Sequence, residues 1–189
     1  MIARLPGKIK KGSRTNAIVQ YEEVLPTLIN FADGKTVDGL DGRSFLPVLY
    51  GKTDRFRDYA YGIHNNIPEG HPYAIRSIRD DSHKLIMNLS APAPYFNKYL
   101  MNPANKNSVW SSWLEKAATD QRDQFIVNRM VNRPSIEFYD LQKDPNELNN
   151  LAADPRYKHI IQQYTARLKA WMREQNDAGK AVDVVYNKH

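Results

Sequence analysis

The sequence contains no cysteine. Disulfide bonds, thiolate metal ligands and a cysteine nucleophile are therefore excluded within its 189 residues. Long apolar runs are also missing, because no stretch approaches the ~20 residues that a membrane-spanning helix needs. Residues 1–7 (MIARLPG) lack the long apolar region and the small-residue cleavage site of a signal peptide. We therefore expect no membrane partner and no signal peptide in this chain.

Basic residues are in modest excess. The chain has 27 Lys and Arg against 21 Asp and Glu, a net charge of +6, and a pI of about 9.4. Such a surface suits nucleic acid, anionic lipid or an anionic polysaccharide, and charge alone does not choose among them. Apart from residues 8–11 (KIKK), the basic residues are scattered, and no nucleic-acid-binding motif accompanies them. We therefore expect no nucleic-acid partner.

The first 55 residues predict a small set of local elements. Residues 2–5 have the pattern of a short strand that stops at the turn signal Pro6-Gly7, and residues 17–19 have that of a second one. Residues 22–32 predict a helix, because acidic residues lead in, Pro26 lies near the first turn and apolar residues recur at helical spacing.

Strand-like segments dominate the sequence from residue 56 onward. Residues 58–63, 73–79, 84–89 and 136–141 are short and rich in strand formers, and residues 80–83 suit a hairpin loop. A variable insertion at 90–134 contains two helical stretches, 109–118 and 120–130. A final helix begins near Pro155, with Asp154 as its cap and an apolar stripe at the 3.6-residue period.

These patterns predict an α+β fold, in which a small antiparallel sheet of about four strands packs against a long C-terminal helix. The expected division is 1–55, then 56–178 with its insertion at 90–134, and finally a loose tail at 179–189.

Four segments, in order, resemble the formylglycine-dependent (type I) sulfatases. Residues 4–7 (RLPG) resemble a strand-to-turn stretch of that family, and residues 23–28 (EVLPTL) resemble its D-x-x-P-T-L helix, with Glu in place of Asp. Residues 41–47 (DGRSFLP) match D-G-x-S-x-x-P. Residues 139–151 (YDLQKDPNELNNL) match the signature Y-D-L-x-x-D-P-x-E-x-x-N-L. Residues 73–89, followed by the insertion, are most similar to the heparan N-sulfatase (sulfamidase) branch and its bacterial members.

The resemblance carries expectations about fold and function. It implies that residues 1–55 are a remnant of the large alkaline-phosphatase-like α/β domain and that the rest is the sulfatase C-terminal subdomain. A complete enzyme of this family would hydrolyse sulfate ester or N-sulfate groups of a sulfated glycan, as in glycosaminoglycan degradation. Calcium and formylglycine are its expected cofactors, and a periplasmic, extracellular or lysosomal-type compartment is its expected location.

The catalytic residues of such an enzyme are missing from this sequence. The family nucleophile derives from the Cys or Ser of C/S-x-P-x-R, and the chain has no Cys. Ser90-Ala91-Pro92 offers a superficial match, but Pro94 stands where Arg is required. The acidic run at 140–147 lacks the central Gly and the twelfth-position Glu of an EF-hand, so a structural role in a turn is favoured over metal binding. We therefore expect no catalytic residue, no metal ligand and no cofactor site in this chain.

Substrate recognition is the role that remains. His64 and His71 lie where a loop between two strands would reach the active site, and both can donate hydrogen bonds to hydroxyl or sulfate groups. Arg76 could clamp an anionic sugar group through two parallel hydrogen bonds. The alternative is that His64 is an ordinary surface-loop histidine and Arg76 a salt-bridged strand residue. Trp110, Trp113 and Tyr95 could stack on sugar rings or form the core of a helical excursion.

The partner predictions follow from the same resemblance. They are a sulfated glycan, an N-terminal catalytic domain absent from this chain, and self-association through an exposed helix at 22–32. That helix should leave Val24, Leu25, Leu28, Ile29 and Phe31 short of partners. Two alternatives stay open: a non-catalytic module that binds anionic glycans through its basic surface, and part of a phosphatase or phosphodiesterase of the alkaline-phosphatase superfamily.

Overall fold

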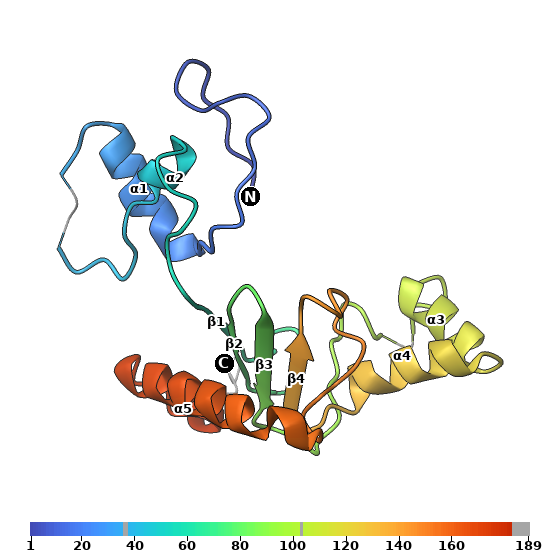
Figure 1. The fold of residues 1–189 in the computed structure, drawn as a ribbon. Coiled ribbons are helices and arrows are strands. Elements are labelled where there is room, and N and C mark those ends of the chain that lie inside the picture. Colours follow the sequence, from blue (N-terminus) through green and yellow to red (C-terminus); the bar gives the residue numbers. More distant parts are fainter. Residues whose placement is uncertain (36–37, 103, 183–189) are drawn as a thin grey trace, which may run out of the picture. The chain divides into compact units, whose positions relative to one another are not determined.

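The structure is a computed structural model that describes residues 1–35, 38–102 and 104–182. The chain divides into two compact units. The first comprises residues 1–60 together with 79–82, and the second comprises residues 61–78 together with the residues from His83 on. Figure 1 shows the helices and strands that make up each unit.

The first unit is built around two helices. A 3-10 turn at Tyr21–Glu23 leads into α1 (Val24–Phe31), and α2 (Leu46–Leu49) packs against α1. The helix predicted at 22–32 is therefore confirmed. Phe45 and Val48 are buried, and the Phe45 ring meets Phe56 edge-on at 6.2 Å between centroids.

The EVLPTL segment holds this unit together through buried polar groups. Glu23 is fully buried, and its carboxylate accepts the backbone N–H of Gln20 and a hydrogen bond from the Arg57 guanidinium. The Thr27 hydroxyl donates to the Glu23 carbonyl at 2.7 Å and accepts the Phe45 N–H at 3.0 Å. Because each of these groups is paired, the motif can bury a charge and a hydroxyl at small cost.

The DGRS segment requires its glycine for a steric reason. A Cβ atom at Gly42 would lie 1.9 Å from the Glu22 carbonyl oxygen and 2.7 Å from the Glu23 backbone nitrogen. Any side chain would therefore displace the start of α1. This close approach explains why the segment after the helix carries glycine at that position.

The two short strands predicted in the first unit do not form. Residues 2–5 form no strand, and residues 17–19 make a single antiparallel bridge between Ile18 and Arg57. A strand exists only where a neighbour completes its hydrogen-bond ladder, and no described residue pairs with 2–5. Ile2 is accordingly 99% exposed.

The second unit contains the sheet. Its strands are β1 (Ala60–His64), β2 (Ile75–Arg79), β3 (His83–Asn88) and β4 (Ile136–Asp140), hydrogen-bonded in the order β1-β2-β3-β4. Strands β3 and β4 are antiparallel, with Leu85 opposite Phe138, and residues 80–82 connect β2 to β3. The four predicted strands and their hairpin are confirmed.

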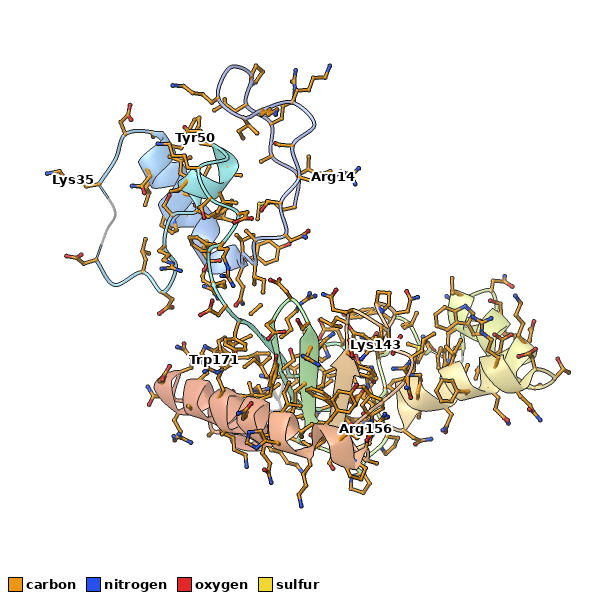
Figure 2. All side chains as sticks on the ribbon, in the orientation of Figure 1. Arg14, Lys35, Tyr50, Lys143, Arg156 and Trp171 are labelled. Atoms are coloured by element: carbon orange, nitrogen blue, oxygen red, sulfur yellow. The ribbon has the colours of Figure 1, made fainter. Side chains whose placement is uncertain are left out.

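The C-terminal helix covers one face of the sheet (Figure 1). A 3-10 turn at Pro155–Tyr157, capped by Asp154, leads into α5 (Lys158–Glu174). The Tyr164 ring contacts Phe138 edge-on at 5.8 Å, and Leu168 is fully buried. Trp171, labelled in Figure 2, stacks on Tyr61 with 4.6 Å between ring centroids. The predicted apolar stripe is therefore the face that meets the sheet, and the predicted α+β arrangement is confirmed.

The insertion forms a helical hairpin. α3 (Val109–Ala117) begins at Ser108, whose hydroxyl accepts the Ser111 N–H, and α4 (Gln121–Val131) begins at Asp120, whose carboxylate caps two backbone N–H groups. The two helices pack on each other, which confirms the predicted pair. Trp110 is buried, and its ring centroid lies 6.2 Å from that of Trp113, as expected for the core of a helical excursion.

The signature after β4 is a turn whose side chains satisfy its own backbone. Asp140 accepts the N–H groups of Gln142 and Lys143 and pairs at 2.8 Å with the ammonium of Lys143, a residue that Figure 2 labels. Asp144 accepts the Asn149 N–H, and the Asn150 side chain accepts the Phe138 N–H. The hydrogen bonds from Lys143 hold the pKa of the Asp140 carboxyl below its usual value. The acidic run therefore has the structural role that was favoured over metal binding.

A buried ion pair fastens the segment after α5 to the sheet. The Arg76 side chain is fully buried on β2, and its Nε and Nη2 atoms donate to the Asp177 carboxylate at 2.5 and 3.0 Å. A 3-10 turn follows at Gly179–Val182, and Nη2 also reaches the Gly179 carbonyl at 3.4 Å. The rest of the predicted tail, residues 183–189, lies outside the described residues. Within the part of the chain that is described, no helix is both long and apolar enough to cross a bilayer.

We predict that Arg76→Met destabilises the second unit by about 3–5 kcal/mol, because it leaves the Asp177 carboxylate buried without its partner. Urea unfolding followed by circular dichroism measures the change. Arg156→Met is the matched control, since Arg156 pairs with Asp154 on the surface and its side chain is 82% exposed. Equal losses of unfolding free energy in the two variants would contradict the stabilising role of the buried Arg76–Asp177 pair.

The same ion pair predicts a pH dependence. The Arg76 guanidinium holds the pKa of the Asp177 carboxyl below its usual value. The stabilisation is therefore complete above the unfolded-state pKa of that carboxyl, and it is lost as the pH falls through the lower folded-state pKa. The acid-induced loss of stability should be smaller in Arg76→Met than in the native sequence.

Candidate functional site

The loop between β1 and β2 is built by two adjacent asparagines. Asn66 is buried with a positive φ of 59°, and its Nδ2 atom donates to the carbonyls of His71 at 2.9 Å and Phe96 at 2.7 Å. Gly70 lies so close that a Cβ atom there would be 2.1 Å from the Phe96 oxygen. The loop is therefore clamped internally and onto the segment that opens the insertion.

Asn65 connects the same loop to the buried ion pair. Its side-chain oxygen accepts a hydrogen bond from Arg76 Nη1 at 2.8 Å, and its backbone carbonyl accepts the Tyr73 N–H at 3.0 Å. The guanidinium thus holds both the segment after α5 and the residue next to His64. This geometry favours the salt-bridged reading of Arg76, in which it positions the loop and does not itself contact a ligand.

The two histidines lie at the surface of this framework. His64 ends β1 and is exposed, and His71 is exposed on the loop, with its carbonyl held by Asn66. The structure therefore places all three predicted residues around one loop. It presents the His64 and His71 rings outward and keeps Arg76 inside.

Tyr95, which the sequence predicted to stack on sugar rings or to belong to the core of a helical excursion, is a neighbour of His64. Its hydroxyl lies 3.3 Å from His64 Nε2, and its ring meets the buried Tyr73 edge-on at 5.3 Å. The Arg133 guanidinium lies 4.9 Å from the centroid of the same ring. Because Tyr95 and Arg133 belong to the insertion, only the folded chain brings them to β1. No spacing in the sequence indicates this contact.

The residues that could hold the family's cofactors are not present among those described. No group of three or more His, Cys, Asp or Glu side chains in the described ranges could bind a metal ion. Ser90 is buried, and its hydroxyl accepts the Ala74 N–H at 3.0 Å, so it serves the sheet and is no precursor of formylglycine. Neither Ser90 nor any cluster of side chains in the described ranges is therefore suited to formylglycine or calcium.

The outer face of α1 is apolar and uncovered. Leu25, Leu28 and Phe31 are 54%, 59% and 43% exposed, while Val24 and Ile29 are half-buried. The prediction that this helix lacks partners is confirmed for three of the five residues. These three side chains therefore form an exposed apolar strip along α1.

Comparison with known proteins identifies the family. The model of the family described as N-sulphoglucosamine sulphohydrolase, C-terminal, matches residues 1–117. The chain belongs to this sulfatase family. It is 35% identical over 178 residues to an ulvan-active sulfatase of Formosa agariphila, covering 93% of this chain and 33% of that protein. It is 23% identical to human N-sulphoglucosamine sulphohydrolase, covering 88% of this chain and 34% of the human enzyme.

A solved sulfatase structure shows the same fold. BT4656, determined in complex with its substrate D-glucosamine-2-N,6-O-disulfate, superposes with a TM-score of 0.62 and 21% identity, covering 93% of this chain and 28% of that one. The present chain therefore has the same fold as part of that protein. It spans about a third of the length of the curated relatives named above.

We predict that Tyr95→Phe changes the tautomer of His64. The prediction takes the Tyr95 hydroxyl as the donor and Nε2 of the neutral ring as the acceptor, which requires the proton on Nδ1; without that donor both tautomers become populated. Imidazole ¹⁵N chemical shifts at about pH 8, where an ordinary histidine is neutral, report the distribution. Tyr99→Phe is the control, because Tyr99 is 70% exposed. Unchanged His64 shifts in Tyr95→Phe would show that the hydroxyl does not orient the ring.

Proposed function

We propose that this chain acts as the C-terminal region of a sulfatase that hydrolyses sulfate ester or N-sulfate groups of a sulfated glycan. Its contribution is a rigid scaffold and one wall of the substrate pocket, formed by the loop between β1 and β2. The observation that carries the proposal is the outward placement of His64 and His71 on a loop whose backbone is fixed by Asn65 and Asn66. Family membership supplies the reaction class.

The clamped loop supports a role in recognition because it lowers the entropic cost of binding. A loop already held in one conformation loses little freedom when a ligand arrives. Neutral imidazole donates one hydrogen bond and accepts another, which suits sugar hydroxyls, and the protonated ring donates two, which suits sulfate oxygens. His64 is the stronger candidate of the two, because Tyr95 holds one of its ring nitrogens and leaves the other for a ligand.

The remaining parts of the reaction belong to a catalytic domain outside this chain. That domain would carry the formylglycine nucleophile and calcium, and it would cover the exposed face of α1 at Leu25, Leu28 and Phe31. The alternative is that a second copy of this chain covers the same face of α1 by self-association. The parent enzyme would work in a periplasmic, extracellular or lysosomal-type compartment, which agrees with the kinds of relatives found.

We predict that the purified 189-residue chain has no sulfatase activity, because its sequence has no Cys to supply the nucleophile and its described residues contain no group of three or more His, Cys, Asp or Glu that could hold a metal ion. Sulfate release from N-sulfated and O-sulfated glucosamine, with and without calcium, measures this. Metal-dependent release of sulfate by the pure chain would contradict the assignment. Retention on immobilised heparin without any activity, even when a catalytic domain is joined upstream, would instead favour the non-catalytic glycan-binding module.

We predict that His64→Ala lowers kcat/KM about tenfold or more in a polypeptide that carries the upstream catalytic domain, since one hydrogen bond to a charged group is worth about 1.5–3 kcal/mol. His159→Ala is the matched control, because His159 is an exposed histidine of α5 whose partner is Gln163. Steady-state kinetics on the sulfated substrate measures both variants. Equal values for His64→Ala and His159→Ala would make His64 an ordinary surface histidine.

A further inference from the structure

A hollow of about 290 Å³ lies between α4 and the turn after β4, and neither the sheet packing nor the His64 loop accounts for it. Its polar lining consists of Arg129, Arg133, Glu137, Asn146 and Glu147. Arg129 is in the last turn of α4, and Arg133 follows just beyond the end of that helix. Two positive and two negative side chains therefore share the lining, and their hydrogen-bond partners decide what it can bind.

Both carboxylates are already occupied by donors from the sheet. Glu137 is buried, with Oε1 accepting Asn88 Nδ2 at 2.7 Å and Oε2 accepting the Tyr139 hydroxyl at 2.5 Å. Burial and the hydrogen bond to Glu137 raise the pKa of Tyr139, so its hydroxyl stays protonated and donates. Each oxygen of Glu147 accepts the Lys84 ammonium, at 3.0 and 2.8 Å. All four acidic oxygens of the lining thus have a partner.

The arginines, in contrast, keep unused donors. Arg133 Nε is buried and has no hydrogen-bond partner among the described residues, and its guanidinium comes only within 3.8 Å of Glu137. Arg129 donates through Nη2, to the Tyr139 oxygen at 3.0 Å and the Glu147 carbonyl at 2.5 Å. A buried N–H of a charged group without an acceptor is costly, and a ligand or water that supplies the acceptor removes that cost.

We propose that this hollow binds an oxyanion, the sulfate or carboxylate group of an acidic glycan or a free inorganic anion. A cation would meet two guanidinium groups and carboxylate oxygens that are already paired. An apolar ligand would leave the guanidinium groups of Arg129 and Arg133 in the lining without an acceptor. An oxyanion meets neither objection. Its oxygens accept hydrogen bonds from the planar guanidinium donors, and its negative charge offsets their positive charge. The site does not depend on the sulfatase function, since none of its residues belongs to the His64 loop.

The first test is a titration of the 189-residue chain with sodium sulfate at constant ionic strength, with sodium chloride as the balancing salt. The ¹H–¹⁵N signals of the arginine Nε–H groups are followed. We expect a saturable shift of the Arg133 signal and none of the Arg173 signal, because Arg173 is exposed on α5. The absence of any saturable Arg133 shift would overturn the proposal.

The second test uses Arg133→Met, with Arg173→Met as the matched control. Loss of the guanidinium should weaken sulfate binding about tenfold or more, which corresponds to one charge-assisted hydrogen bond, and the control should bind as the native chain does. Native sulfate affinity in a folded Arg133→Met would overturn the proposal. If that variant does not fold, Arg133→Lys replaces it, since Lys keeps the charge but lacks the Nε donor, and the same weakening is expected.

The third arm identifies the source of the anion. A heparin-derived disaccharide and its desulfated, carboxylate-bearing counterpart are titrated in the same way. Shifts at Arg133 with either sugar assign the site to a glycan-borne group. Shifts with inorganic sulfate alone assign it to a free anion. Failure of all three ligands to move the Arg133 signal contradicts an oxyanion site of any kind.

Discussion

The buried guanidinium of Arg76 is the interaction on which the second unit depends. It lies inside the sheet on β2 and holds three separate pieces of chain: the Asp177 carboxylate, the Gly179 carbonyl and the Asn65 side chain. A buried charge is tolerated only when it is paired and hydrogen-bonded, so these pieces must all be in place when the sheet closes. The loop that follows His64 is therefore held by the same guanidinium that holds the segment after α5.

Arg76 shows that a residue predicted to bind a ligand can instead have a structural role. The features that made Arg76 a plausible anion clamp, a planar fork of donors and a permanent charge, are also those that let one side chain bind a carboxylate, an amide oxygen and a carbonyl at once. Sequence alone does not distinguish the two roles, because the deciding partner, Asp177, lies far along the chain. The two histidines differ from Arg76, since both are exposed.

Sequence reasoning succeeded where a pattern is local. The α5 stripe, the strand-forming runs and the Asp154 cap each depend on neighbouring residues, and each element formed as predicted. It failed at residues 2–5, where no described segment pairs with the apolar run as a neighbouring strand. It also missed the environment of His64, because Tyr95 and Arg133 reach β1 only through the insertion, whose two ends meet where the Tyr95 N–H donates to the Val131 carbonyl at 2.7 Å.

The insertion contributes residues both to the surroundings of His64 and to the hollow beside α4, which its sequence does not indicate. One of its residues, Tyr95, contacts the His64 ring, and the guanidinium that packs on Tyr95, that of Arg133, also lines the hollow beside α4. An anion in that hollow would contact the guanidinium of Arg133, which lies against the Tyr95 ring next to His64. The two sites are separate in their ligand contacts but share this one aromatic ring. Variation in the insertion would therefore alter recognition at both sites while leaving the sheet, α5 and the signature turn unchanged.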